Sequence, residues 1–419
     1  MRSDVFILFG GLAITRFPNY IYELNDNKIE VYNFESSTNR DKYNELMNKN
    51  LDISKFDEVF FIEIGDFNSL LQHIEIISSN KNIIGVYSLL EDFVVEAARI
   101  ATLFDVKTTG ILSSVISRNK HLQRIIFKDV SPEYYKINKR TKDINYPFPA
   151  VVKPINMQGS FGVMKVLNTE ELKVYLDSVE DEILCEQYIE GDEYSVETVM
   201  LNKKVIYQQV TSKTTNCKNT KYFAEIGHTV PANVSLRKKN AMFKFVNGIL
   251  NTLKFDTGIS HIEIKCDNER IYLVEVAVRN PGDSILTLHY LSTGVYLERL
   301  IIKCLLDKNF EIPRFKKYAR QVYLEHNVGK LLEVILYDYD VPVEYYRENG
   351  YLKSNFSFSK INTARLLEVV VNKKRGSFIK KISNSDDRVV YFIVDANSYD
   401  DLDNITKSVE EKLLIMVGN

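Results

Sequence analysis

The chain has 419 residues, with 54 Lys and Arg against 56 Asp and Glu, which gives a formal net charge of -2 at pH 7. Binding to a nucleic-acid backbone needs clustered Lys and Arg, so a near-neutral chain without a basic block argues against nucleic acid as the partner. No apolar run reaches the roughly 18 residues that a membrane helix needs, so we expect no membrane span.

Length and cysteine usage narrow the class of protein further. A single hydrophobic core usually stops growing at about 250–300 residues, so this length predicts several packed units. The four cysteines have neither metal-site nor disulfide spacing, so we expect ordinary buried residues in a reducing cytoplasm. They are Cys185, Cys217, Cys266 and Cys304.

The N-terminal third alternates strand and helix signals. Strands are predicted near residues 4–9, 28–33, 57–63 and 82–87, with helical patterns between them. This order is typical of a small parallel α/β domain, which we expect to reach residue 119.

The apolar run 5–14 is similar to the core of a signal peptide, but Asp4 precedes it and no small-residue cleavage site follows. A first strand, a turn at Gly10-Gly11 and a helix fit better.

A lysine and a glycine-containing loop follow one another at residues 148–163. The apolar segment 148–153 ends in Lys153, and the loop 156–163 contains Gly159, Ser160 and Gly162. Glycines let backbone N–H groups approach phosphate oxygens, and a lysine at a strand end adds a point charge for the same anion. The loop matches neither common nucleotide fingerprint, so a plain hairpin turn stays open as an alternative.

The segment 186–197 joins the end of a strand to a turn at Gly191 and then to an alternating strand. Such a hinge can offer the backbone groups of Tyr188 and Ile189 to an adenine edge. The acidic side chains around it suit an exocyclic amine and ribose hydroxyls.

Two further segments alternate apolar and charged residues. If both are strands, His261, Glu263 and Lys265 share one face, as do Glu275, Ala277 and Arg279. Adjacent strands would then direct two carboxylates and two cations at one spot. Carboxylate oxygens are the ligands that Mg²⁺ prefers, and nearby cations stabilise developing charge, an arrangement typical of phosphoryl transfer. A solvated cross-strand ion pair is the alternative.

The last hundred residues combine strand and helix signals. Strands are predicted at 378–381 and 388–394, and an amphipathic helix at 399–415. We therefore expect a small C-terminal α+β domain.

Taken together and in this order, the motifs resemble those of the ATP-grasp superfamily. They are Lys120, Lys153-Pro154, the glycine loop, Glu186-x-Tyr-Ile, Gly191-x-Glu193-Tyr-Ser-Val-Glu197, His261-x-Glu263 and Glu275-x-x-x-Arg279-x-x-Gly282. Within the superfamily, the segment 223–232 is similar to the E-x-G-H-x-x-P segment of the L-amino acid ligases, a carboxylate–amine ligase branch. The resemblance covers roughly residues 1–310 and extends weakly to the C-terminus.

The resemblance implies a fold and a domain division. The fold class would be α/β, with an α+β grasp region: a parallel α/β domain at 1–119, a mobile lid subdomain at 120–205, a subdomain at 206–315 that holds metal and substrate, and a C-terminal α+β domain at 316–419.

It also implies roles for residues. ATP would be held by Lys120, Lys153, Gly159, Ser160, Gly162, Glu186, Tyr188, Ile189 and Glu193, and Mg²⁺ or Mn²⁺ by Glu263 and Glu275. Arg279 and Lys153 would be catalytic, and His228, Arg279 and Gly282 would bind substrate. His261 is equally compatible with support of the metal ligands and with packing.

One position departs from the family pattern. Many members carry Asn two residues after the second metal carboxylate, whereas this chain has Ala277. A methyl group cannot coordinate a metal, so the number of bound ions, one or two, stays open.

The predicted activity is that of an ADP-forming carboxylate–amine ligase that works through an acyl phosphate, with a small-molecule carboxylate and amine as substrates. Three alternatives stay open: a carboxylase that uses bicarbonate, a ligase that loads an amino acid onto a carrier-protein thiol, and a non-catalytic nucleotide-binding module. A carrier protein and a second copy of the chain stay open as partners.

Overall fold

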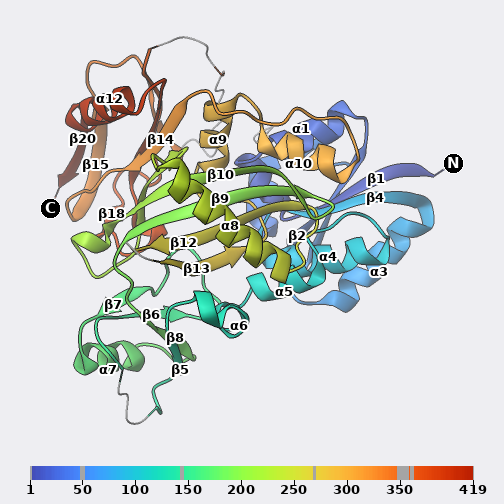
Figure 1. The fold of residues 1–419 in the computed structure, drawn as a ribbon. Helices are drawn as coiled ribbons and strands as arrows, with labels where there is room; N and C mark the ends of the chain where they lie inside the picture. The colour runs from blue at the N-terminus through green and yellow to red at the C-terminus, as the bar shows by residue number, and fades with distance from the viewer. Residues whose placement is uncertain are drawn as a thin grey trace.

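The computed structural model describes residues 2–47, 52–141, 146–267, 270–346, 358 and 363–418. Four sheets organise these residues: one of four parallel strands, one of nine strands, and two smaller antiparallel ones. Figure 1 shows the N-terminal sheet on one side of the nine-stranded sheet, the C-terminal elements on the other, and a small lobe below. The mixed α/β architecture expected from the sequence is confirmed.

The N-terminal sheet has the order β3-β2-β1-β4, and all of its pairs are parallel. Its strands are β1 (Ser3–Phe9), β2 (Glu30–Ser36), β3 (Glu58–Ile62) and β4 (Lys81–Ser88). Its helices are η1 (Gly11–Thr15), α1 (Asn19–Asp26), η2 (Ser37–Asn39), α2 (Arg40–Met47), η3 (Asp52–Lys55), α3 (Phe67–Asn80), η4 (Glu91–Phe93) and α4 (Val94–Leu103). All four predicted strands are confirmed within two residues at most boundaries.

Strand β1 is apolar on both faces because helices cover both faces of this sheet. Phe6 and Leu8 pack with α1 and with α10 (Leu297–Leu305), whereas Val5 and Ile7 pack with α3 and α4. A parallel strand buried on both sides reads as a continuous apolar run, which explains the likeness of segment 5–14 to a signal peptide.

The nine-stranded sheet has the order β13-β12-β9-β10-β11-β14-β19-β17-β16. Its strands are β9 (Asp192–Leu201), β10 (Lys204–Thr215), β11 (Glu225–Val230), β12 (Gly258–Cys266), β13 (Ile271–Ala277), β14 (Tyr318–Tyr323), β16 (Val343–Tyr345), β17 (Arg365–Val371) and β19 (Val390–Ala396). The helices beside it are η6 (Asn216–Lys218), α8 (Leu236–Thr252), α9 (Ile285–Thr293) and α10. Because β11 pairs with β14, this sheet continues without a break into the C-terminal region.

The small lobe is a four-stranded antiparallel sheet, which we call the lid sheet, with the order β5-β8-β6-β7. Its elements are β5 (Tyr134–Ile137), β6 (Ala150–Pro154), β7 (Met164–Val166), α7 (Thr169–Asp177) and β8 (Ile183–Gln187). Strand β9 pairs with β10 and β12 instead, so the segment 120–205 divides between two sheets. We therefore propose that the lid ends near Gln187 and not at residue 205.

The C-terminal region adds a three-stranded sheet with the order β18-β15-β20. Its elements are β15 (Gly329–Leu336), β18 (Phe378–Ile379), η7 (Ser385–Asp387), α12 (Tyr399–Lys412) and β20 (Leu413–Gly418). The prediction that the last helix reaches residue 415 was wrong: α12 ends at Lys412. The apolar run from Leu413 pairs with β15 as a strand, because the edge of β15 presents backbone N–H and C=O groups that a helix could not pair with.

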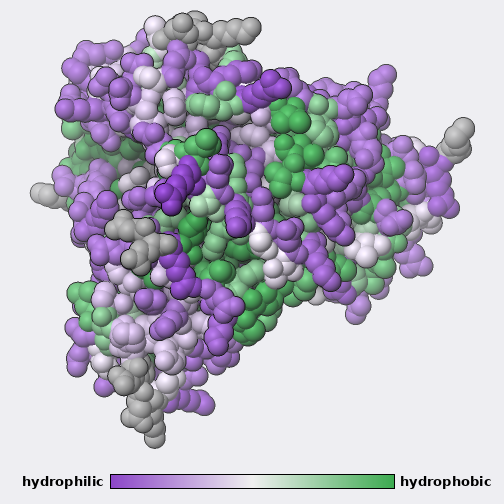
Figure 2. Space-filling view, in the orientation of Figure 1, coloured by the Kyte–Doolittle hydropathy of each residue, from purple (hydrophilic) through white to green (hydrophobic). Residues whose placement is uncertain are grey.

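Two short helices connect the N-terminal domain to the lid sheet: α5 (Ile111–Ser117) and α6 (Lys120–Ile126), followed by η5 (Lys128–Val130). Large apolar side chains are exposed on them, namely Ile111, Leu112, Val115, Ile125 and Ile126. Figure 2 shows apolar residues gathered over this part of the surface.

The four cysteines are free and buried, as expected. No helix among the described residues is both long and apolar enough to cross a bilayer.

Glu298 on α10 is buried between the N-terminal helices and the nine-stranded sheet, and its Oε2 atom has no hydrogen-bond partner in the described residues. Burial raises its pKa from 4.5 to about 7. The folded state therefore holds this proton at pH values where the unfolded state has lost it, so stability decreases as pH rises from 4.5 through about 7.

We predict that Glu298→Gln removes this part of the pH dependence and stabilises the protein above pH 7 by up to roughly 3 kcal/mol, since one pKa unit corresponds to about 1.4 kcal/mol. Thermal unfolding across the pH range tests this, with Glu75→Gln on the exposed face of α3 as the control. A Glu298→Gln variant whose stability has the same pH slope as the unsubstituted protein would contradict the prediction.

Candidate active site

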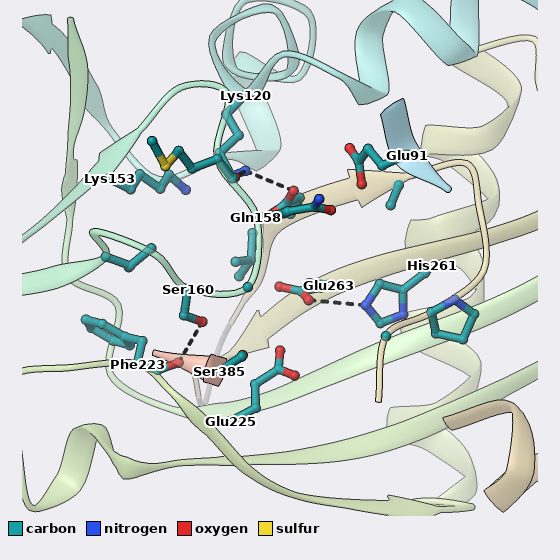
Figure 3. A pocket seen from close by; sticks show the side chains of 18 of the residues that line it. Glu91, Lys120, Lys153, Gln158, Ser160, Phe223, Glu225, His261, Glu263 and Ser385 are labelled. Carbon is teal, nitrogen blue, oxygen red and sulfur yellow. Dashed lines mark hydrogen bonds and ion pairs between the residues drawn. The ribbon is translucent and has the colours of Figure 1, made fainter. Parts of the chain in front are cut away.

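A cavity of about 540 Å³ lies where the N-terminal domain, the lid sheet, the nine-stranded sheet and the C-terminal region meet. Each part contributes lining residues, among them Glu91, Lys153, Glu263 and Ser385. Figure 3 shows Lys120 and Lys153 on one side of the cavity, with Glu225 and Glu263 pointing toward its centre. Twelve of the fourteen predicted site residues line it, and His228 and Gly162 do not.

The two predicted metal carboxylates are direct partners in the sheet. Glu263 on β12 pairs with Glu275 on β13, and both side chains line the cavity. The expected faces are confirmed, because His261, Lys265, Ala277 and Arg279 line the same cavity. Two carboxylates on adjacent strands, beside open space, form an oxygen donor set that fits Mg²⁺ or Mn²⁺.

Lys213 on β10 is the central cation of this site, and the sequence motifs did not indicate it. Its Nζ atom lies 2.5 Å from Glu225, 2.6 Å from Glu263 and 3.4 Å from Glu193. Burial opposes its charge, but the three carboxylates raise the pKa of Lys213 well above its usual value. Lys213 and Glu193 are register partners on β10 and β9. Only the pairing of distant strands makes this cluster, so no local motif marks it.

His261 joins the metal carboxylate to the core of the sheet. Its Nδ1 atom lies 2.7 Å from Glu197 and its Nε2 atom 3.1 Å from Glu263. Burial opposes protonation, but these two carboxylates raise the pKa of His261 to about 9. The fully buried Glu197 also accepts a hydrogen bond from Ser195 at 2.7 Å. His261 is therefore both packed and positioned to orient Glu263.

The two predicted phosphate lysines have different surroundings. Lys120, the first residue of α6, donates to the carbonyl of Met157 at 2.6 Å and lies 3.0 Å from Glu275. Lys153 at the end of β6 lies 2.6 Å from Glu186. Burial lowers the pKa of Lys153 to about 8, with the Arg124 charge adding to the effect and Glu186 opposing it.

Glu186 has less freedom than its predicted adenine contact requires. It pairs with Lys153 and accepts hydrogen bonds from Arg124 at 2.7 and 3.2 Å. Both carboxylate oxygens are therefore engaged in a buried cluster. We propose that Glu186 acts on a nucleotide mainly by positioning Lys153, while the neighbouring hinge residues contact the base.

The backbone conformation of the glycine loop requires glycine at two positions. Gly159 and Gly162 have φ of 68° and 71°, values that side-chain-bearing residues rarely adopt. A Cβ on Gly162 would also lie 2.8 Å from Pro154. Contacts from three sides fix the loop: Ser160 donates to the carbonyl of Phe223 at 3.0 Å, and Gly162 accepts from Tyr175 at 2.7 Å, in addition to the bond from Lys120.

The hinge after β8 forms an aromatic and cationic wall of the cavity. Tyr188 and Phe223 have ring centroids 6.4 Å apart, and the Lys265 ammonium lies 5.2 Å from the Tyr188 centroid. Ile189 is buried beside them and Glu193 lines the same side. Aromatic rings beside a lysine offer a planar base both stacking surface and a hydrogen-bond donor.

Arg279 lines the cavity beside the N-terminal domain. Its Nε atom donates to Glu91 of the N-terminal domain at 2.7 Å, and its Nη1 atom to the Asn280 carbonyl at 2.6 Å. Gly282 follows on the cavity wall, and nothing lies within 4 Å of the position that a Cβ would take there. Packing therefore does not require glycine at this position.

His228 lies behind the cavity wall and not on it. Its Nε2 atom is 2.8 Å from Asp283 and 3.3 Å from Glu225, and both of these carboxylates line the cavity. Burial opposes its charge, but the two carboxylates raise the pKa of His228 to about 9. His228 can therefore orient groups that reach a substrate, although it has no direct access itself.

This geometry defines a class of proteins in which a small antiparallel lid sheet and a larger sheet enclose a polar cavity lined with lysines and paired carboxylates. Residues 146–288 match the family model of the ATP-grasp domain. This part of the chain therefore carries an ATP-grasp domain.

Known proteins share parts of the sequence and the whole fold. A D-alanine–D-alanine ligase of Pelagibacter ubique is 27% identical over 204 residues, which is 43% of this chain and 63% of the relative. One from a Nitratiruptor species is 33% identical over 109 residues, 24% of this chain and 32% of the relative. The chain thus spans less than two thirds of these curated relatives.

Among solved structures, an L-amino acid ligase from Bacillus licheniformis superposes with a TM-score of 0.74 at 18% identity and full coverage of both chains. A phosphoribosylglycinamide synthetase from Anaerococcus prevotii gives 0.66 at 15% identity, over 99% of this chain and all of that one. These likenesses establish the fold, including the C-terminal region.

Lys213 generates a prediction about stability. Replacing it by Met leaves Glu193, Glu225 and Glu263 close together without their shared cation, and breaking a buried ion pair typically costs about 3–5 kcal/mol. We predict a large decrease in the melting temperature of Lys213→Met, partly reversed by MgCl₂ because a divalent cation can replace the lost charge.

Thermal unfolding with and without MgCl₂ measures both effects, and Lys218→Met, an exposed lysine on η6, is the matched control. A melting temperature like that of the control would contradict the central role of Lys213.

Proposed function

We propose that the protein is an ATP-dependent, ADP-forming ligase that joins a carboxylate to an amine through an acyl phosphate. The observation that carries the proposal is the arrangement around one cavity of two lysines, two sheet-paired carboxylates and an arginine, on an ATP-grasp fold. Phosphoryl transfer depends on the positioning of reactants and on charge stabilisation, and these residues supply both.

The nucleotide would lie between the lid sheet and β12–β13. The hinge wall of Tyr188, Ile189 and Phe223 would take the adenine, and Glu193 the ribose. Lys120, Lys153 and the N–H groups of the loop around Ser160 would hold the triphosphate. Lys120 now pairs with Glu275 and with the Met157 carbonyl, so it is already fixed at the border between loop and metal carboxylates.

Glu263 and Glu275 would hold Mg²⁺ or Mn²⁺, which would neutralise phosphate charge. The methyl group of Ala277 removes the amide oxygen that many family members place there, so water or a phosphate oxygen would complete the coordination. Lys213 and His261 keep Glu263 ionised, and burial alone would oppose this ionisation.

Arg279 would bind the reacting carboxylate and then stabilise its tetrahedral adduct. One carboxylate oxygen attacks the γ-phosphorus, the bond to the ADP oxygen breaks, and an acyl phosphate forms. The amine nitrogen then attacks the acyl carbon, phosphate leaves, and the nitrogen loses a proton. Glu91 holds the guanidinium in place, and buried charge pairs of this kind are worth more than exposed ones.

His228 and Gly282 were expected to contact substrate. We propose an indirect role for His228, which orients Asp283 and Glu225. Gly282 leaves space on the wall next to Arg279, which suits a substrate that passes close to the backbone.

A homodimer stays a prediction, and no observation on this structure favours a carrier-protein partner.

A carboxylase that uses bicarbonate is the second candidate, since the fold is also shared with an N5-carboxyaminoimidazole ribonucleotide synthetase from Thermotoga maritima, at a TM-score of 0.62 and 16% identity. The sequence matches to D-alanine–D-alanine ligases favour an amine ligase. The two candidates differ in whether phosphate release requires bicarbonate.

We predict that a phosphate-release screen with ATP, MgCl₂ and pairs of amino acids finds turnover that needs both a carboxylate and an amine, with ADP as the nucleotide product. Mass spectrometry of the active pairs should detect the amide. Release of AMP would contradict the ADP-forming chemistry. Turnover that depends on added bicarbonate, without amide formation, would favour the carboxylase.

We predict that Glu275→Gln lowers turnover at least 100-fold, because removal of one charged metal ligand weakens charge stabilisation in the transition state. Binding of a non-hydrolysable ATP analogue should change less than tenfold, since the hinge is untouched and Lys120, although it loses its ion pair with Glu275, can still bind phosphate. Calorimetry and the phosphate assay separate the two effects, with Glu58→Gln on the exposed edge strand β3 as the control. Equal losses in binding and turnover would argue against a metal role.

A further inference from the structure

A segment of the C-terminal region contacts the glycine loop of the lid. The backbone N–H of Ser385, at the start of η7, donates to the carbonyl of Gly159 at 3.2 Å. Figure 3 shows Ser385 beside Ser160 and Phe223 at the same side of the cavity. The loop that would cover a triphosphate is therefore attached to residues more than 200 positions later in the chain.

Arg388 fixes the conformation of this segment. Its Nε atom donates to the Ser385 carbonyl at 2.9 Å and its Nη1 atom to the Glu225 carbonyl at 3.0 Å. The same guanidinium also binds Asp283 through both carboxylate oxygens, at 2.7 and 2.8 Å. A planar guanidinium binds one carboxylate through two N–H groups while its other N–H groups reach further acceptors, a geometry that a lysine cannot reproduce.

The contacts of Arg388 continue toward the metal carboxylates. Asp283 lies 2.8 Å from His228, and His228 lies 3.3 Å from Glu225. Glu225 shares Lys213 with Glu263. One chain of charged contacts thus connects the lid loop, the C-terminal region and the metal strands.

We propose that residues 384–388 form a latch for the glycine loop, and that Arg388 is a positioning residue that couples this latch to Asp283 and the metal carboxylates. The role of this latch rests on the proposed function, because the latch would hold the loop over a bound triphosphate. The C-terminal region would then be part of the catalytic machinery and not an attached domain. A latched loop excludes water, which would otherwise hydrolyse an acyl phosphate.

Ser385→Pro tests the latch because it deletes the donor of one hydrogen bond with little change to the backbone. Ser385 is the first residue of a 3-10 helix, a position that tolerates proline. The preceding Asn384 is extended, with φ of -152° and ψ of 179°, which is the conformation favoured before proline. Ser385→Ala keeps the N–H and is the matched control.

The readout is limited proteolysis with chymotrypsin, since Met157 and Phe161 of the loop are exposed. Without nucleotide, Ser385→Pro should be cut in the loop about fivefold faster than Ser385→Ala, the change expected for the loss of one net backbone hydrogen bond. Equal rates for the two variants would overturn the latch.

A non-hydrolysable ATP analogue with MgCl₂ separates this proposal from the proposed function. Suppressed cutting of the unsubstituted protein supports a nucleotide lid. Cutting that the analogue leaves unchanged would overturn the lid function, whereas the comparison without nucleotide still decides the latch.

Arg388→Lys tests the positioning role, with Arg365→Lys as the control. Arg365 binds Asp395 through both carboxylate oxygens in the same region, at 2.9 and 2.5 Å, and does not line the cavity. Arg388→Lys should speed cutting of the loop as Ser385→Pro does, and the double variant should add little to either single change. If both arginine variants lower the melting temperature and neither changes cutting, Arg388 is only a structural ion pair.

Discussion

The site depends on one electrostatic constraint: several carboxylates around the cavity are buried or half-buried, and each must be balanced by a cation. Moving a charge out of water costs several kcal/mol unless an opposite charge and hydrogen bonds compensate for it. Glu263 meets this constraint through Lys213 and His261, Glu275 through Lys120, and Glu186 through Arg124 and Lys153. The cavity therefore keeps a set of ionised groups at fixed positions before any ligand arrives, which is the preorganisation that charge-stabilising catalysis requires.

The cations come from different parts of the chain, so the constraint also binds these parts together. Lys120 begins α6, Lys213 lies on β10, and Arg388 belongs to the C-terminal region. The segment after β13 shows the result most clearly. Arg279 contacts Glu91, Asn280 accepts a hydrogen bond from Tyr20 at 2.5 Å, and Asp283 meets Arg388. One short segment on the cavity wall is thus held by both the N-terminal and the C-terminal regions.

The nine-stranded sheet gives this network a rigid support. Its strands run from β13, which carries Glu275, through β11 to β14, β19 and β17 of the C-terminal region. Buried strands of a sheet are close-packed and hardly compressible, so the side chains that they carry keep their positions relative to one another. The glycine loop differs, because it lies outside this sheet and its contacts are single hydrogen bonds to Lys120, Tyr175, Phe223 and Ser385. Single bonds of this kind are individually weak, which suits a loop that has to admit and release a ligand.

The sequence by itself determined the strands of the N-terminal domain, the resemblance to ATP-grasp proteins and the cavity face of β12 and β13. These features follow from local periodicity and from motifs within short segments, such as the alternation that places His261, Glu263 and Lys265 together. Only the tertiary structure decided the rest. Lys213 enters the site because β9, β10 and β12 pair across the sheet, His228 is hidden behind Asp283 and Glu225, and Glu186 is engaged by Arg124. The last strand, β20, forms only because β15 offers it an edge. Each of these outcomes depends on contacts between residues far apart in the chain, and a local sequence pattern contains no information about which distant residue will supply the partner.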